Sequence, residues 1–199
     1  MKRFALSLVV AVGIAQYAWA WGLSGGLSLG LVTMDFLNAQ LQDLANREGA
    51  SVSPLRLGLG WEAGFWPWRW LGLGLEWLSS SGGVYGREDY PLSAQGLSLS
   101  LLFGWNLEIA GFSFPIQGGI GPYWFSVTGF LEGWSLGWGG KVSMGLVFLR
   151  VAGLEALVET GGRIVRGSVL QTPRGALAPQ DMPALDFSGL FFSFKIMWK

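Results

Sequence analysis

The sequence predicts a closed, antiparallel, up-and-down transmembrane β-barrel of eight strands. Half of the 199 residues are apolar and only 13% are charged, whereas a soluble domain carries about 25% charge. After the first twenty residues, no apolar run is long enough for a membrane-spanning helix. Eight segments alternate apolar residues with small or polar ones, which is the period of a strand with two unlike faces. A chain that crosses lipid without helices must close into a barrel to satisfy its backbone.

The N-terminus predicts a secretory signal peptide over residues 1–20. Lys2 and Arg3 supply the positive charge, residues 4–14 are apolar, and the small residues of Ala18-Trp19-Ala20 are typical of a cleavage site. A membrane-anchoring helix is the alternative, but the apolar run is shorter than the roughly 20 residues that a span needs. We therefore expect residues 21–199 to form the barrel domain.

Each of the eight alternating segments has about the length that a tilted strand needs to cross a bilayer. In the second, Leu57, Leu59 and Trp61 alternate with Gly58 and Gly60. A soluble β-sandwich would also alternate, but its polar face would carry more charge than these Gly and Ser residues. Small residues instead suit a narrow lumen, where opposite walls crowd one another. The predicted strands are 21–32, 55–65, 69–79, 95–106, 112–121, 135–148, 153–165 and 186–198.

The connections between these segments alternate in length, as in outer-membrane barrels with short periplasmic turns and long outer loops. The short connections are 66–68, 107–111 and 149–152, and the long ones are 33–53, 79–93, 122–134 and 166–185. This pattern places both termini in the periplasm. A ten-stranded barrel is the alternative if the first or last long connection contains a hairpin.

The first long connection predicts a short amphipathic helix at about residues 35–47. Phe36, Leu37, Leu41 and Leu44 recur at helical spacing, and Gly49 is a typical helix terminator. We expect this helix to cover the mouth of the barrel, with lipid contact or action as a lid as the alternatives.

The tryptophans predict two aromatic girdles at the membrane interfaces. The periplasmic girdle consists of Trp21, Trp66, Trp68, Trp70, Trp105 and Trp198. Trp124 and Trp134, together with Tyr123, mark the other interface. The alternative is that these aromatics form the core of a soluble sandwich, which would not concentrate them beside short turns.

Strand alternation directs eight ionisable side chains into the lumen. An unpaired buried charge is costly, so we expect these four acids and four bases to pair across the barrel. They are Arg56, Glu62, Glu76, Lys141, Glu155, Glu159, Arg163 and Lys195. The alternative is a narrow polar pathway or ligand pocket, because eight strands leave room for side chains or one small ligand.

The composition also argues against several functions. The absence of His and Cys removes the commonest general base, the thiol nucleophile and the usual metal ligands. The balance of 13 basic and 13 acidic residues provides no electrostatic surface for nucleic acid. We therefore expect no enzyme activity, no cofactor and no bound metal.

The chain resembles the small eight-stranded bacterial outer-membrane barrels, the class that contains proteins like outer membrane proteins A, X and W. The resemblance includes the C-terminal FFSFKIMW, in which Phe192, Phe194, Ile196 and Trp198 alternate toward a terminal aromatic residue. In that class such an ending is the signal for the barrel-assembly machinery, and this chain departs from it by the extra Lys199. The resemblance implies an outer-membrane location and contact with its lipids.

The sequence thus favours a monomeric barrel with a structural or surface-interaction role, whose lumen is filled by small residues and ion pairs. A narrow barrel that transports or binds a lipid or another small apolar molecule is the second hypothesis.

Overall fold

The computed structural model describes residues 22–168, 170–171 and 185–198. The predicted signal peptide and Trp21 lie outside these residues, as does Lys199.

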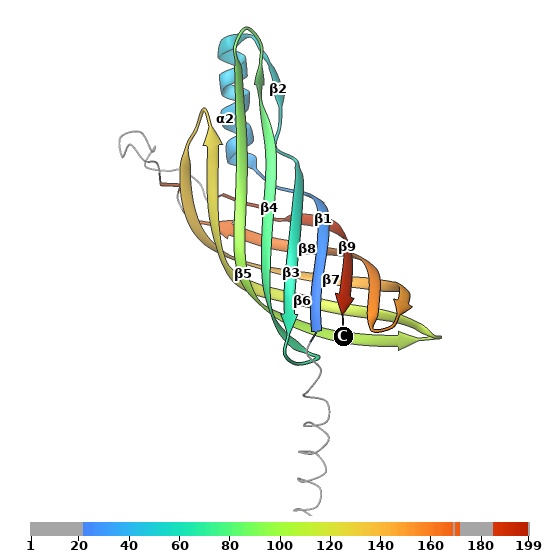
Figure 1. Cartoon of the computed structure of the whole chain (residues 1–199). Coiled ribbons are helices and arrows are strands. Elements are labelled where there is room, and N and C mark those ends of the chain that lie inside the picture. The colour runs from blue at the N-terminus through green and yellow to red at the C-terminus, as the bar shows by residue number, and fades with distance from the viewer. Residues whose placement is uncertain (1–21, 169, 172–184, 199) are drawn as a thin grey trace, which may run out of the picture.

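Eight antiparallel strands close into a barrel, as predicted (Figure 1). The last strand returns to the first, with Leu23 opposite Trp198 and Gly30 opposite Phe191. The pairing of β4 with β5 completes the ring, so the strand count is eight and not ten. The strands are β1 (Gly22–Leu31), β3 (Leu57–Trp66), β4 (Leu71–Tyr85), β5 (Asp89–Ile109), β6 (Phe112–Gly129), β7 (Gly133–Val151), β8 (Leu154–Gly167) and β9 (Gly189–Trp198).

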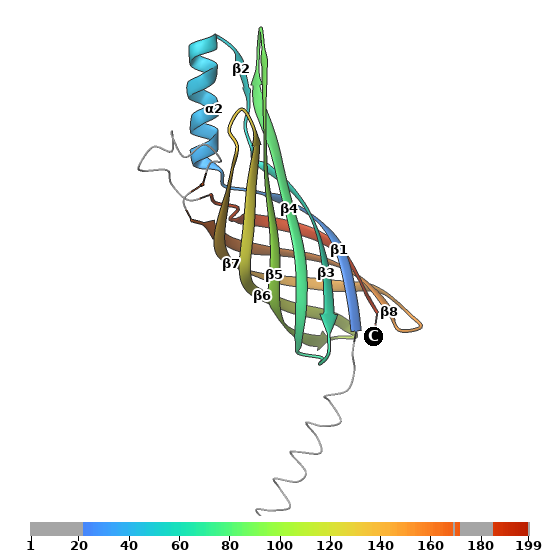
Figure 2. The same cartoon turned by 60° about the vertical axis from the view of Figure 1, so that its left-hand side comes forward.

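Short turns join the strands at one end of the barrel, which we call the turn end. At the opposite end lies α2 (Asp35–Glu48), and we call this the helix end (Figures 1 and 2). The helix has the predicted position, and Gly49 ends it in the left-handed conformation with φ 63°. Glycine adopts this conformation at little cost. A three-residue strand, β2 (Ser51–Ser53), then pairs with β4.

The predicted long loops 79–93 and 122–134 are wrong, because strand structure continues through most of both. The hairpin of β4 and β5 leaves only residues 86–88 as a turn, and that of β6 and β7 leaves residues 130–132. Figure 2 shows these hairpins standing beyond the ring at the helix end. The prediction fails because outward residues change from apolar to polar there, while inward residues such as Leu92 and Val127 stay apolar and buried. The strands therefore continue into the hairpins, but there the inward side chains are apolar and the outward ones polar, which is the reverse of the pattern in the ring.

An apolar cluster fills the interior at the helix end, and we call it the apolar plug. Its helical part is Leu37, Leu41 and Ala45, which all point toward the barrel. Side chains from the barrel wall and the adjoining segments complete it: Met34, Leu55, Leu78, Val84, Leu92, Ala94, Tyr123, Phe125, Val127, Val165, Leu170, Leu185 and Phe187. The helix thus packs its apolar face onto this plug and stands beside the protruding end of β4 (Figures 1 and 2).

Asn38 fastens the helix to the chain segment that leads into β3. Its side-chain amide donates to the carbonyl oxygen of Leu55 at 3.1 Å and accepts from the Leu55 N–H at 2.7 Å. This paired contact satisfies both backbone groups of a residue that is fully buried in the plug.

Candidate functional site in the barrel interior

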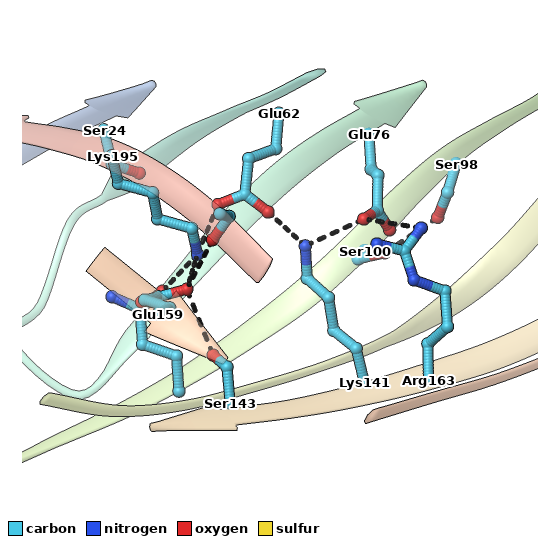
Figure 3. Close-up of polar contacts among 12 residues, drawn as sticks. Ser24, Glu62, Glu76, Ser98, Ser100, Lys141, Ser143, Glu159, Arg163 and Lys195 are labelled. Carbon is cyan, nitrogen blue, oxygen red and sulfur yellow. Dashed lines mark hydrogen bonds and ion pairs between the residues drawn. The ribbon is translucent and has the colours of Figure 1, made fainter. Parts of the chain in front are cut away.

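Six of the eight predicted lumen charges meet in one continuous network, which we call the charge belt (Figure 3). Strand alternation directs all six side chains inward, from five different strands. The belt consists of Glu62 on β3, Glu76 on β4, Lys141 on β7, Glu159 and Arg163 on β8, and Lys195 on β9. Three carboxylates therefore face three cations, and the belt carries no net formal charge.

Glu76 is the acceptor at one end of the belt. Its carboxylate lies 3.2 Å from Lys141 Nζ and 3.6 Å from an Arg163 nitrogen. The hydroxyl of Tyr123 donates to the same carboxylate at 2.6 Å. Arg163 also stacks on the ring of Phe191, with its guanidinium carbon 4.7 Å from the ring centre. Each charged group here has a partner on another strand.

Glu62 and Lys195 continue the belt across the lumen. Glu62 forms ion pairs with both Lys141 and Lys195. Lys195 Nζ also lies 2.6 Å from a Glu159 oxygen and donates to the Gln117 side chain at 3.0 Å. These contacts link β3, β6, β7, β8 and β9 through side chains alone.

Glu159 lies at the other end of the belt, and its two carboxylate oxygens have very different surroundings. One carboxylate oxygen, Oε2, accepts from Ser143 at 3.2 Å, from Ser193 at 3.3 Å and from Lys195. The other, Oε1, is buried and has no hydrogen-bond partner among the described residues. An unpartnered buried oxygen is costly, so Glu159 is the least well satisfied member of the belt among the described residues.

A small cavity adjoins the belt on the side of the turn end. It is lined in part by Ser24, Gly64, Gly74, Ser100 and Leu102, and it has room for about one water molecule. The interior therefore contains an apolar plug, then the charge belt, then this small cavity of mixed polar and apolar lining.

Two of the predicted lumen charges are not members of the belt. The predicted inward direction is wrong for Arg56, whereas Glu155 does point inward but pairs with Arg150 on the neighbouring strand. Arg56 precedes β3 at the helix end and is exposed. Glu155 is buried near the turn end, where it accepts from Arg150 at 2.9 Å. Arg56 precedes the first residue of β3, so the alternation of that strand does not set its direction. Glu155 is the second residue of β8, so it lies at the turn end of the lumen.

Sequence reasoning misses the neutral members of the network. It assigns Tyr123 to the membrane interface, but this residue is buried and points at Glu76. Extending the inward register of Ser113, Gln117 and Gly119 along β6 would have identified it. The serines at 143 and 193 carry the same alternation signal, but nothing in the sequence reveals that both donate to Glu159.

Most of the predicted girdle tryptophans that the structure describes are exposed, namely Trp68, Trp70, Trp105, Trp124, Trp134 and Trp198. Trp66 is wrongly assigned, because its side chain is only 5% exposed and lies inside the barrel. Its indole N–H donates to Ser24 Oγ at 3.1 Å. A β-carbon on Gly72 would lie 2.9 Å from the indole, so glycine there provides its space. Alternation could have shown this, because Trp66 shares the inward register of Glu62 and Gly64.

The side chains of the predicted assembly signal line the outer face of β9. Phe192, Phe194, Ile196 and Trp198 are all exposed, while Ser193 and Lys195 between them point into the lumen. Among the described residues, no group of three His, Cys, Asp or Glu side chains could hold a metal ion. No helix in the described part of the chain is long and apolar enough to cross a membrane.

No known protein family has a model that matches the sequence, and no curated protein matches it either. Among solved structures, the chain is similar to Neisserial surface protein A, with a TM-score of 0.51 and 9% sequence identity over 90% of this chain and 96% of that one. Outer membrane protein OprG from Pseudomonas aeruginosa gives a TM-score of 0.46 and 11% identity over 89% of this chain and 94% of its own. The N-terminal β-barrel domain of Pseudomonas aeruginosa OprF gives 0.38 and 10% over 88% and 96%. The first of these agrees with the closed eight-stranded fold, and at this identity it identifies the fold alone.

Proposed function

We propose that this protein is an integral outer-membrane barrel with a sealed interior and a structural or surface-interaction role. The observation that carries the proposal is the filling of the lumen, in which the buried apolar plug lies directly above a charge belt without net charge.

The outer surface supports the location in a membrane. Large apolar side chains stand exposed around the ring, including Leu27 at 68%, Trp138 at 67% and Leu190 at 69% of their surface. In water such a continuous apolar surface would be unfavourable, whereas lipid is its natural solvent. The proposed signal peptide, the C-terminal strand pattern and the short turns together favour export to the outer membrane with the turn end in the periplasm.

The interior supports the sealed state. The plug side chains are nearly all within a few per cent of complete burial, and the cavity beside the belt has room for about one water molecule. A hydrated ion passing this route would have to displace packed side chains from both layers.

Planar-bilayer recording tests the sealed barrel. The purified chain is first shown by circular dichroism and by resistance to sodium dodecyl sulfate to be folded and inserted. We expect no discrete conductance steps above the lipid background. Reproducible steps from the folded, inserted chain would overturn the sealed-barrel proposal.

A second candidate function is the binding or transfer of a small apolar molecule. The observation that favours it is the apolar lining beneath α2, which would become accessible if the helix moved away. Asn38→Ala removes the paired contact with Leu55 and should loosen the helix. If the wild type binds an apolar fluorescent probe in detergent-free vesicles, and N38A binds it faster, this candidate is preferred over the sealed barrel. Binding by neither chain beyond that of empty vesicles excludes it.

A further inference from the structure

The outer face of the protruding hairpins carries a patch of uncharged polar side chains directly above the apolar surface. Cross-strand register orders these residues in two levels. Ser79 lies opposite Gln95, which lies opposite Ser126. Two residues nearer the helix end, Ser81 lies opposite Ser93, which lies opposite Thr128. We call these six residues the polar patch: Ser79, Ser81, Ser93, Gln95, Ser126 and Thr128.

The polar patch begins where the apolar surface ends. The level below it consists of Trp77, Leu97, Trp124 and Leu136, which are paired across β4, β5, β6 and β7. The first level of the patch is two residues farther along each strand, which is about 7 Å. Its neighbour on β7 is Trp134, opposite Ser126 and 49% exposed. The patch is therefore continuous with the surface that we propose to meet lipid.

The chemistry of the patch distinguishes it from an ordinary solvated sheet. All six side chains carry a hydroxyl or amide group and none is charged, and each is exposed or half-buried. None of the six makes a side-chain hydrogen bond to another residue in the described part of the chain. The charged residues of this region, such as Asp89 and Glu132, lie at the hairpin tips. The patch thus presents free donors and acceptors without charge, beside an exposed indole ring.

We propose that this patch contacts the neutral sugars of the glycolipid headgroups that surround the barrel. This inference rests on the proposed outer-membrane location, because it is the continuity with the lipid-facing surface that brings headgroups against the patch. Hydroxyl and amide groups exchange hydrogen bonds with sugar hydroxyls, and an indole ring packs on the apolar face of a sugar ring. Phosphates and acidic sugars would instead call for Arg or Lys side chains, which the patch lacks.

Thermal unfolding in vesicles tests the proposal. The barrel is inserted into phospholipid vesicles, into vesicles with glycolipid that carries neutral sugars, and into vesicles with glycolipid truncated to its acidic portion. We expect neutral-sugar glycolipid to raise the unfolding midpoint above that in both other vesicles. The triple variant S81A/S93A/T128A should lose about half of that increase, because it removes the polar groups of one of the two levels of the patch.

The matched control is the triple variant Q40A/Q42A/N46A, which removes three exposed, uncharged polar side chains from α2 and should keep the whole increase. Free oligosaccharide is added in a separate arm and should not reproduce the effect, because the headgroup is held against the patch by its lipid. An equal increase for the wild type and S81A/S93A/T128A, or an increase with truncated glycolipid as large as with the complete one, overturns the proposal. Failure of the folded barrel to insert at all overturns the proposed membrane location as well, so the two failures are distinguishable.

Discussion

The two halves of the barrel interior are filled by different means. At the helix end, side chains such as Leu41, Phe125 and Phe187 pack as a hydrophobic core. Toward the turn end, the charge belt crosses the lumen through ion pairs. Apolar packing is non-directional and tolerates small shifts, whereas a buried ion pair depends on geometry and on every partner being present. The comparison teaches that the same narrow lumen is filled at one end by packing that tolerates small shifts of its side chains, and toward the other end by ion pairs that require every partner.

The largest effect is expected from breaking the charge belt. Glu76→Gln removes the negative charge that Lys141 and Arg163 share in a buried site, and removal of one partner from a buried ion pair costs about 3–5 kcal/mol. We expect a loss of that size in the free energy of unfolding, measured by urea titration in lipid vesicles. Glu132→Gln, at the exposed tip of the hairpin of β6 and β7, is the control and should change it by less than about 0.5 kcal/mol. Equal effects would show that the belt contributes no more than a surface charge.

The next largest effect is expected in the apolar plug. Leu41 lies on the buried face of α2 and is 0% exposed. Replacing Leu by Ala in a packed core costs about 2–5 kcal/mol. We expect Leu41→Ala to fall in the lower part of this range, because the helix can shift to fill the space. The half-buried Leu44 on the same helix should cost less when replaced by Ala, in the same titration. A cost at Leu44 as large as at Leu41 would contradict the packing described for the plug.

A smaller effect is expected where the belt meets the closing strands. A β-carbon on Gly26 would lie 2.6 Å from Lys195 Cγ and 2.8 Å from the Phe194 carbonyl oxygen. We therefore expect Gly26→Ala to cost about 1–3 kcal/mol through overpacking. Its neighbour Gly25 points outward, and a β-carbon there would have its nearest neighbouring atom 3.9 Å away. Gly25→Ala should be close to neutral, and a matching loss there would indicate a general strand effect instead of crowding against Lys195.

The smallest effect is expected for an ion pair outside the barrel. Arg47 and Asp43 pair on α2 at 2.5 Å, with side chains 72% and 56% exposed. Exposed pairs at this helical spacing contribute about 0.3–0.5 kcal/mol, so Arg47→Ala should lower the stability by no more than that. The loss should shrink further at high salt. A loss comparable to that of Glu76→Gln would remove the distinction between buried and exposed charges in this molecule.

Much of the fold was predictable because a strand with two unlike faces has a period that local sequence displays. The same period directed Glu62, Glu76 and Lys141 inward. It failed for Arg56, which precedes β3, and it did not show that Glu155, which points inward at the turn end, pairs with Arg150. It also failed for the two hairpins at the helix end, because their outward residues are polar and their inward residues apolar, which is the reverse of the pattern in the ring.

The aromatic assignments failed for a related reason. Residue type alone favours a membrane interface for Trp66 and Tyr123. Their register along the strand points both of them inward, and the structure places them there. Where residue type and register disagree, register is the better guide, because it is imposed by the backbone.

The sequence by itself determined that the chain forms a closed barrel, that a helix lies in the first long connection, and which faces of the strands turn inward. These properties follow from periodicities of two and of about 3.6 residues, which are local. Only the tertiary structure decided that Lys195 joins Glu62 to Glu159, that Tyr123 reaches Glu76, and that α2 seals an apolar plug. These contacts depend on the stagger between strands and on the position of segments far apart in the chain, and no local pattern encodes either.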